Sequence, residues 1–152
     1  MNTTQPAVLD GIQMKGKLNI VVRDEQGNIK ESREVDNLVV TVGKNFVASR
    51  MKDATATAMS HMAVGTNATA AVVGDTTLGT ETARVALTST TVTTNSVAYV
   101  ATFGAGTGTG ALVEAGILNN STGGTLLCRT VFSVVNKGAN DSLTITWTVT
   151  VS

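Results

Sequence analysis

The clearest alternation of hydrophobic and polar residues lies at the end of the chain. Between positions 143 and 151 every second residue is apolar, and threonine fills each position between them. The apolar residues of this segment are Leu143, Ile145, Trp147, Val149 and Val151. A period of two places these side chains on one side of an extended chain, so the segment is predicted to be a strand with one buried face.

Similar segments precede it, separated by turn residues. Segments 83–92 and 96–103 are predicted to pair with each other, and segments 111–118 and 125–135 are predicted to be further strands. In the second segment, the residues predicted to share one face are Val97, Tyr99, Ala101 and Phe103. In the fourth segment they are Leu126, Cys128, Phe132 and Val134.

Strands at this spacing, with turn signals between them, are typical of an all-β fold. We therefore expect an antiparallel β-sandwich, either of the jelly-roll or of the immunoglobulin-like type. The high content of threonine and valine fits this class, because β-branched residues favour pleated strands.

The first third of the chain predicts a charged β-hairpin. Leu18, Ile20 and Val22 alternate with polar residues, Asp24 to Asn28 supplies turn residues, and a charged segment returns to position 36. A charged hairpin over 17–36 suits the exposed edge of a sheet. Residues 1–15 show no clear period, and we expect an N-terminal arm that contacts a partner chain, followed by a single domain over 16–152.

One short helix is predicted over about 42–52, because Val42, Phe46, Val47 and Met51 fit a helical period better than a strand. Thr41 is a candidate N-cap for it. A small-residue linker then leads into a short strand over 61–64. Residues 67–82 are polar and contain glycine, so they are predicted to form a long loop.

Composition and charge narrow the class of partner. Charged residues make up 14% of the chain, and 11 basic residues balance 11 acidic residues. This balance removes the electrostatic argument for binding nucleic acid or an anionic membrane. No apolar run reaches the roughly 18 residues of a membrane helix, and the N-terminus lacks the apolar core of a signal peptide. We therefore expect a protein made in the cytoplasm that contacts neither nucleic acid nor membrane.

The segment Gly104–Gly110 resembles a phosphate-binding glycine loop at first sight. A P-loop requires a lysine and a hydroxyl residue after its last glycine, and none follows Gly110. A dinucleotide fingerprint requires a following helix, yet only about eight residues separate this loop from the next turn signals. We interpret it as a flexible connection between two strands, whose small residues suit close approach of a neighbouring chain.

The single histidine and the single cysteine of the chain do not indicate a catalytic or metal site. His61 is the only histidine and Cys128 the only cysteine, so neither a metal-ligand spacing nor an internal disulfide is present. We expect His61 to have a packing or surface role. Cys128 lies on the apolar face of a predicted strand, which favours a buried and inert thiol.

Three acidic residues lie in or near loops, namely Asp75, Glu81 and Glu114. Paired carboxylates can hydrolyse glycosides, but such sites usually bind sugar with aromatic side chains, which are scarce here. Residues 74–81 also lack the ligand spacing of a calcium loop. We interpret Glu81 and Glu114 as solvated charges or as ion-pair partners of Arg84 or Arg129. No catalytic, cofactor-binding or metal-binding residue is assigned.

Four short motifs remain, namely His61–Thr66, Leu78–Glu81 with Arg84, Glu114–Ile117 and Leu143–Trp147. With these motifs the chain resembles small structural proteins of tailed-bacteriophage virions, of the head-decoration and head-fibre group. A weaker likeness extends to the N-terminal domain of phage tail-collar fibres, and together the likeness covers residues 17–152. The chain lacks the shaft repeat and the receptor-binding tip of a full tail fibre.

The resemblance implies a non-enzymatic virion protein, without cofactor, that decorates or cements the capsid surface. Its implied partner is the major capsid protein, and a homo-oligomer is expected, with a trimer as the first guess. The alternatives are a tail or neck fibre module that supports host attachment, and a carbohydrate-binding or glycan-cleaving domain on the virion.

Overall fold

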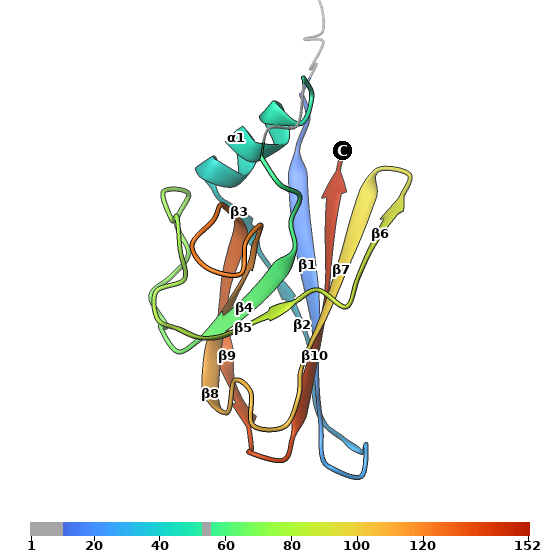
Figure 1. Ribbon diagram of the computed structural model, residues 1–152, viewed down its shortest axis with the longest axis vertical. Helices are drawn as coiled ribbons and strands as arrows, with labels where there is room; N and C mark the ends of the chain where they lie inside the picture. Colours follow the sequence, from blue (N-terminus) through green and yellow to red (C-terminus); the bar gives the residue numbers. More distant parts are fainter. Residues whose placement is uncertain (1–10, 53–55) are drawn as a thin grey trace, which may run out of the picture.

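The computed structural model of the protein describes residues 11–52 and 56–152 (Figure 1). Within them the chain forms ten strands and one helix. The elements are β1 (Met14–Arg23), β2 (Ile29–Asp36), β3 (Leu38–Val39), α1 (Thr41–Ser49), β4 (His61–Gly65), β5 (Glu81–Ala86), β6 (Ser89–Thr93), β7 (Ser96–Phe103), β8 (Gly110–Leu118), β9 (Leu126–Lys137) and β10 (Ser142–Val151). No helix in this part of the chain is long and apolar enough to cross a membrane.

The strands form two antiparallel sheets of five strands each. Sheet A has the order β2-β1-β10-β7-β6, and sheet B has the order β3-β9-β8-β4-β5. The sheets stand face to face in Figure 1, with α1 at one end of the molecule. The predicted all-β antiparallel sandwich with one short helix is confirmed.

The core lies between the two sheets, and the alternation of the last strand explains its composition. Four apolar residues of β10 are 0–4% exposed, namely Leu143, Ile145, Trp147 and Val149. Val151, at the end of the strand, is 37% exposed. The threonines between them lie on the outer face of sheet A. Because β10 is the central strand, its inward side chains contact neighbours on every side.

The charged hairpin is present as β1 and β2, but the predicted arm is too long. Met14 and Lys15 belong to β1, where they pair with Val151 and Thr150 of β10. Gln13 exchanges two backbone hydrogen bonds with Ser152, at 2.7 and 2.8 Å. Residues 13–15 show no alternation of apolar and polar side chains, but their main chain still pairs with the C-terminal strand and extends β1. Residues 1–10 lie outside the described residues, and their contact with a partner stays a prediction.

The short helix is confirmed, but its predicted N-cap is wrong. Val40 is the N-cap, Thr41 is the first helical residue, and no side chain caps this end. The amide of Thr41 instead donates to the carbonyl of Val73, at 2.8 Å. The long loop therefore satisfies the helix terminus with its backbone, which sequence reasoning about cap residues misses. That loop ends at Thr80, because Glu81 and Thr82 already belong to β5.

Segment 83–92 is not a single strand, contrary to the prediction. Its first part, from Ala83 to Ala86, lies in β5 of sheet B, and its last part lies in β6 of sheet A, where it does pair with β7. The crossing occurs at two residues. The amide of Leu87 donates to the carbonyl of Ser60, directly before β4 of sheet B, and the amide of Thr88 donates to the carbonyl of Val100 in β7 of sheet A.

The predicted common face of β9 is correct for Cys128 and Phe132, which pack in or against the main core, and wrong for Leu126 and Val134. Val134 is 47% exposed, whereas the next residue, Val135, is fully buried. The register between β8 and β9 shifts between Leu112 and Glu114, and this irregularity reverses which side chains face the core. Leu126 packs in a second apolar cluster rather than in the main core.

We predict that Trp147→Ala lowers the free energy of unfolding by about 3–5 kcal/mol, as removal of a large core side chain does. Trp147 is 0% exposed and packs between the sheets. Since it is the only tryptophan, unfolding in urea is best followed by circular dichroism. The variant Trp147→Phe serves as the control and is expected to lose less. A cost near zero for Trp147→Ala would contradict the position of this side chain in the core.

Candidate functional site

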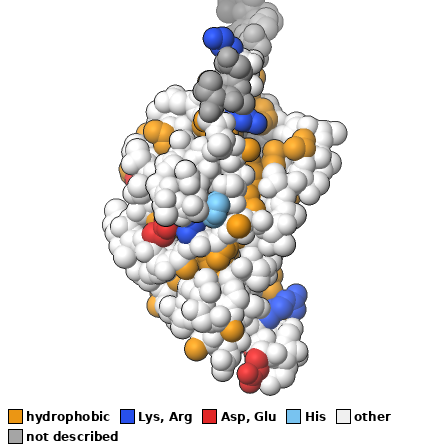
Figure 2. Space-filling model, viewed as in Figure 1, with side chains coloured by type: hydrophobic (Ala, Val, Ile, Leu, Met, Phe, Trp, Pro, Cys, Tyr) orange, Lys and Arg blue, Asp and Glu red, His pale blue; other side chains and the backbone are white. Residues whose placement is uncertain are grey.

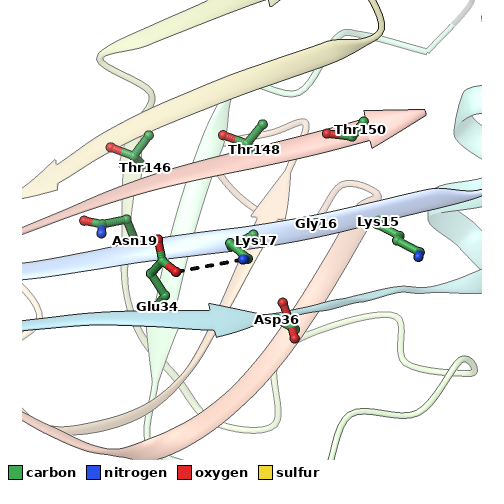
Figure 3. Close-up of a pocket in the computed structure, with 9 residues that line it drawn as sticks. All are labelled: Lys15, Gly16, Lys17, Asn19, Glu34, Asp36, Thr146, Thr148 and Thr150. Carbon is green, nitrogen blue, oxygen red and sulfur yellow. Dashed lines mark ion pairs between the residues drawn. The ribbon is translucent and has the colours of Figure 1, made fainter. Parts of the chain in front are cut away.

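A shallow groove of about 420 Å³ lies on the outer surface of sheet A (Figure 3). Three neighbouring strands line it. The lining residues are Thr146, Thr148 and Thr150 from β10, Lys15, Gly16, Lys17 and Asn19 from β1, and Glu34 and Asp36 from β2. The strict alternation of β1 and β10 puts these polar side chains outside, because the apolar residues between them face the core.

The charges in this groove are exposed and weakly coupled. Lys17 Nζ lies 3.8 Å from Glu34 Oε2, and both side chains are more than half exposed. An exposed pair of this kind contributes about 0–1 kcal/mol. The groove therefore offers hydroxyl, amide and charged groups for hydrogen bonding to a partner, and it suits a contact surface.

A second polar centre is buried beneath the long loop between β4 and β5. Glu114, on β8, is 0% exposed, and its carboxylate accepts three backbone hydrogen bonds. The donors are the amides of Asn67 at 3.3 Å, Gly79 at 2.8 Å and Thr80 at 2.7 Å. This carboxylate therefore holds the beginning and the end of the loop together.

Arg129, on the neighbouring strand β9, balances this buried charge. Its Nε and one terminal nitrogen each lie 2.9 Å from Glu114 Oε2. The guanidinium also donates to Asp75 at 2.9 Å and to the carbonyl of Thr69 at 3.0 Å. Asp75 in turn accepts the amide of Val72, at 3.0 Å. The ion pair and its partners thus tie the middle of the loop to sheet B.

Two glycines allow this loop to lie against the sheet. A Cβ atom on Gly65 would come within 2.2 Å of the carbonyl oxygen of Thr80. A Cβ atom on Gly116 would come within 2.5 Å of Leu78, which belongs to the apolar cluster under the loop. Gly65 and Gly116 belong to the motifs singled out in the sequence, and in the structure both allow close packing against the loop.

Glu81 and Arg84 brace a different turn. Arg84 donates to both carboxylate oxygens of Glu81, at 2.9 and 2.7 Å. It also donates to the carbonyls of Asn120 and Gly123, at 2.9 and 2.8 Å. The expectation that Glu81 and Glu114 pair with arginines is therefore confirmed, as Glu81–Arg84 and Glu114–Arg129.

The glycine loop has a cationic partner that the sequence analysis did not identify. Lys137, at the end of β9, is 2% exposed, and its Nζ donates to the carbonyl of Gly104 at 2.9 Å. Burial lowers the pKa of Lys137, and the charge of Asp141 opposes this shift. Gly106 also donates to the carbonyl of Ala139, at 2.8 Å. No helix follows the loop, because β8 begins at Gly110.

Asp141 organises the turn beside this lysine. Its carboxylate accepts the amide of Gly138 and the ammonium of Lys30, both at 2.7 Å. These hydrogen bonds, that from Lys30 above all, hold the pKa of Asp141 below its ordinary value. The signal for Lys137 and Asp141 in the sequence is weak, since a lysine before a glycine turn usually lies at the surface.

His61 and Cys128 lie in separate places. His61 is half-buried at the start of β4, and its Nδ1 lies 2.8 Å from the hydroxyl of Ser60. Cys128 is fully buried, and burial raises the pKa of its thiol, which keeps it protonated at neutral pH. The expectation of a buried thiol is confirmed.

The charged residues singled out from the sequence thus form two separate groups, with Glu114, Arg129 and Asp75 in one and Glu81 and Arg84 in the other. In both groups the carboxylates bind arginine rather than facing each other across an open cleft. Among the described residues, no group of three or more histidine, cysteine or acidic side chains has the arrangement of a metal site.

Comparison of the chain with protein-family models, with curated proteins and with solved structures gave no match.

We predict that Glu114→Gln destabilises the protein by about 3–5 kcal/mol, because the change leaves the buried guanidinium of Arg129 without its main counter-charge. Urea unfolding measures the cost, and limited proteolysis within residues 66–80 reports release of the loop. The matched control is Glu81→Gln, which removes a partly exposed carboxylate and is expected to cost about 1 kcal/mol or less. Equal effects of both changes would contradict the structural importance of the Glu114 carboxylate.

Asp141 makes the stability depend on pH at the acid end. Its pKa is lowered in the folded protein, so the folded state binds fewer protons than the unfolded state in this range. The stabilisation is complete above the unfolded pKa of about 3.9 and is lost as the pH falls through the folded value. Asp141→Asn is therefore expected to flatten the acid loss of stability, measured by urea midpoints between about pH 6 and pH 2.

The control for this prediction is Lys30→Met, which removes the largest cause of the shift. NMR titration of the Asp141 carboxyl group should then show a higher pKa than in the wild type. An Asp141 pKa that does not respond to Lys30→Met would show that the shift has another origin.

Proposed function

We propose that this protein is a non-enzymatic structural protein of a tailed-bacteriophage virion. In this proposal it binds the major capsid protein and decorates or cements the outer surface of the head as a homo-oligomer. The motifs that carry the family resemblance are the starting point, and the contacts of their residues favour a structural role over a catalytic one.

The supporting observation is how the structure uses the charged motif residues. Glu114 holds three loop amides, and its partner Arg129 holds a loop carbonyl and Asp75. Glu81 and Arg84 brace the turn between β8 and β9. The hydrogen bonds of these four side chains all go to other groups of the same chain. What remains at the surface of sheet A is a threonine-rich face with a shallow polar groove, which suits attachment to another protein surface.

The test is quantitative mass analysis of purified virions of the phage that encodes the protein, together with antibody labelling. We expect many copies per particle, with the label on the head. A protein that binds only the assembled shell also stabilises that shell by mass action. Heads that lack it are therefore expected to lose DNA at a lower temperature, and added protein is expected to restore the resistance.

Other outcomes would replace this proposal. A few copies per particle with label at the neck or tail would favour a fibre or adaptor module. Specific binding on a glycan array would favour a carbohydrate-binding domain. Absence of the protein from purified virions would reject a structural role in the particle altogether.

A further inference from the structure

Strand β6 is the exposed edge of sheet A next to β7, and no strand of the described chain lies beyond it. All five of its residues are exposed, and Val92 is 71% exposed. It lies at one side of the molecule in Figure 1, where the β6–β7 hairpin extends away from sheet B. An edge strand presents unpaired N–H and C=O groups, which another strand can bind.

The other three sheet edges carry devices that block such pairing. The opposite edge of sheet A, β2, contains five charged residues: Lys30, Glu31, Arg33, Glu34 and Asp36. In sheet B, β3 is only two residues long, and β5 carries Glu81 and Arg84 next to a register irregularity. Short strands, charges and bulges are the usual protections of sheet edges.

Strand β6 has none of these protections. It reads Ser-Thr-Thr-Val-Thr, and the sequence contains no charged residue and no histidine from Val85 to Val113. Its pairing with β7 is regular along all five residues. Figure 2 shows few charged side chains on this face over β6 and β7, where apolar and uncharged atoms predominate. Since the other edges are protected, this one exposed edge suits a specific partner.

We propose that β6 pairs antiparallel with β6 of a second copy of this chain and joins two A sheets into one continuous sheet. The strand is complementary to itself, because every residue of one copy meets an uncharged serine, threonine or valine of the other. A partner strand with charges would leave them without counter-charges along this edge. The arrangement has two-fold symmetry and closes on itself, so the protected remaining edges limit it to a dimer.

The register follows from the hairpin. Thr93 and Ser96 form the closing pair around the two-residue turn Thr94–Asn95, so the odd-numbered residues of β6 bond to β7. Thr90 and Val92 then direct their backbone groups to the free edge. The register that pairs the whole strand places Thr91 opposite Thr91 of the second copy, and Thr90 opposite Val92.

The side chains suit this register. On the outer face, two Thr91 hydroxyls would meet across the two-fold axis, and Thr102 and Thr144 already make such a contact between β7 and β10, at 2.9 Å. On the inner face, the exposed side chain of Val92 would pack on Thr90 of the second copy, a favourable β-branched pair. The proposed attachment to the phage head does not depend on this pairing, because the homo-oligomer of that proposal can also form through another surface.

Disulfide trapping tests the pairing in the full chain. Thr91→Cys places two thiols in a non-hydrogen-bonded pair, where Cα atoms lie about 4.5 Å apart and a disulfide can form. We expect it to form covalent dimers under mild oxidation at least about tenfold faster than Ser32→Cys, which lies exposed on the charged edge strand β2. The native Cys128 is fully buried, so it gives a low background.

A second measurement does not depend on a new cysteine. Sedimentation of the wild type should show reversible association that rises with concentration, and Thr91→Lys should abolish it by placing two ammonium groups face to face. Ser32→Lys is the matched control and should leave association unchanged. The amides of Thr90 and Val92 should also exchange with solvent more slowly as concentration rises.

Three results would overturn the proposal. The first is equal trapping rates at positions 91 and 32. The second is a wild type that stays monomeric up to millimolar concentration. The third is association that Thr91→Lys leaves unchanged, which would place the contact between copies on another surface.

Discussion

The buried ion pair between Glu114 and Arg129 is the interaction on which one half of this structure depends. Neither charge is tolerable alone under the loop, because an unpaired buried charge costs several kcal/mol. Together they form hydrogen bonds with residues at the beginning, in the middle and at the end of the loop between β4 and β5. The loop in turn supplies Leu78 to the second apolar cluster and a carbonyl to the first turn of α1. One pair of side chains on adjacent strands thus organises the outer layer of sheet B.

This explains why the motifs of the sequence carry the residue types that they do. Gly65 and Gly116 provide space for the loop backbone and for Leu78, while Glu114 supplies the acceptor between them. In the structure these residues form a clamp, because the carboxylate of Glu114 accepts three loop amides and also pairs with Arg129.

The period of two predicted the sandwich, the core face of β10 and the charged hairpin, because each depends on local alternation. The same reasoning failed where contacts between distant segments determine which residues face the core and which sheet a strand joins. The register irregularity at Leu112 turned Val135 inward in place of Val134, and the crossing at Leu87 and Thr88 divided one predicted strand between two sheets. For the site, the pairing of Glu81 and Glu114 with arginines was predictable from charge balance. The burial of Lys137 was not, because its carbonyl partner on Gly104 is distant in sequence.

The two backbone hydrogen bonds between Gln13 and Ser152 have a topological consequence. They bring the start of β1 and the end of β10 together, where these two neighbouring strands pair in sheet A. The start of β1 and the end of β10 are therefore close enough for a short connection to join them. New ends opened in an exposed turn, such as Asp24–Asn28, leave every strand pair intact. In this sense the order of the strands along the chain matters less to the fold than their neighbours in space.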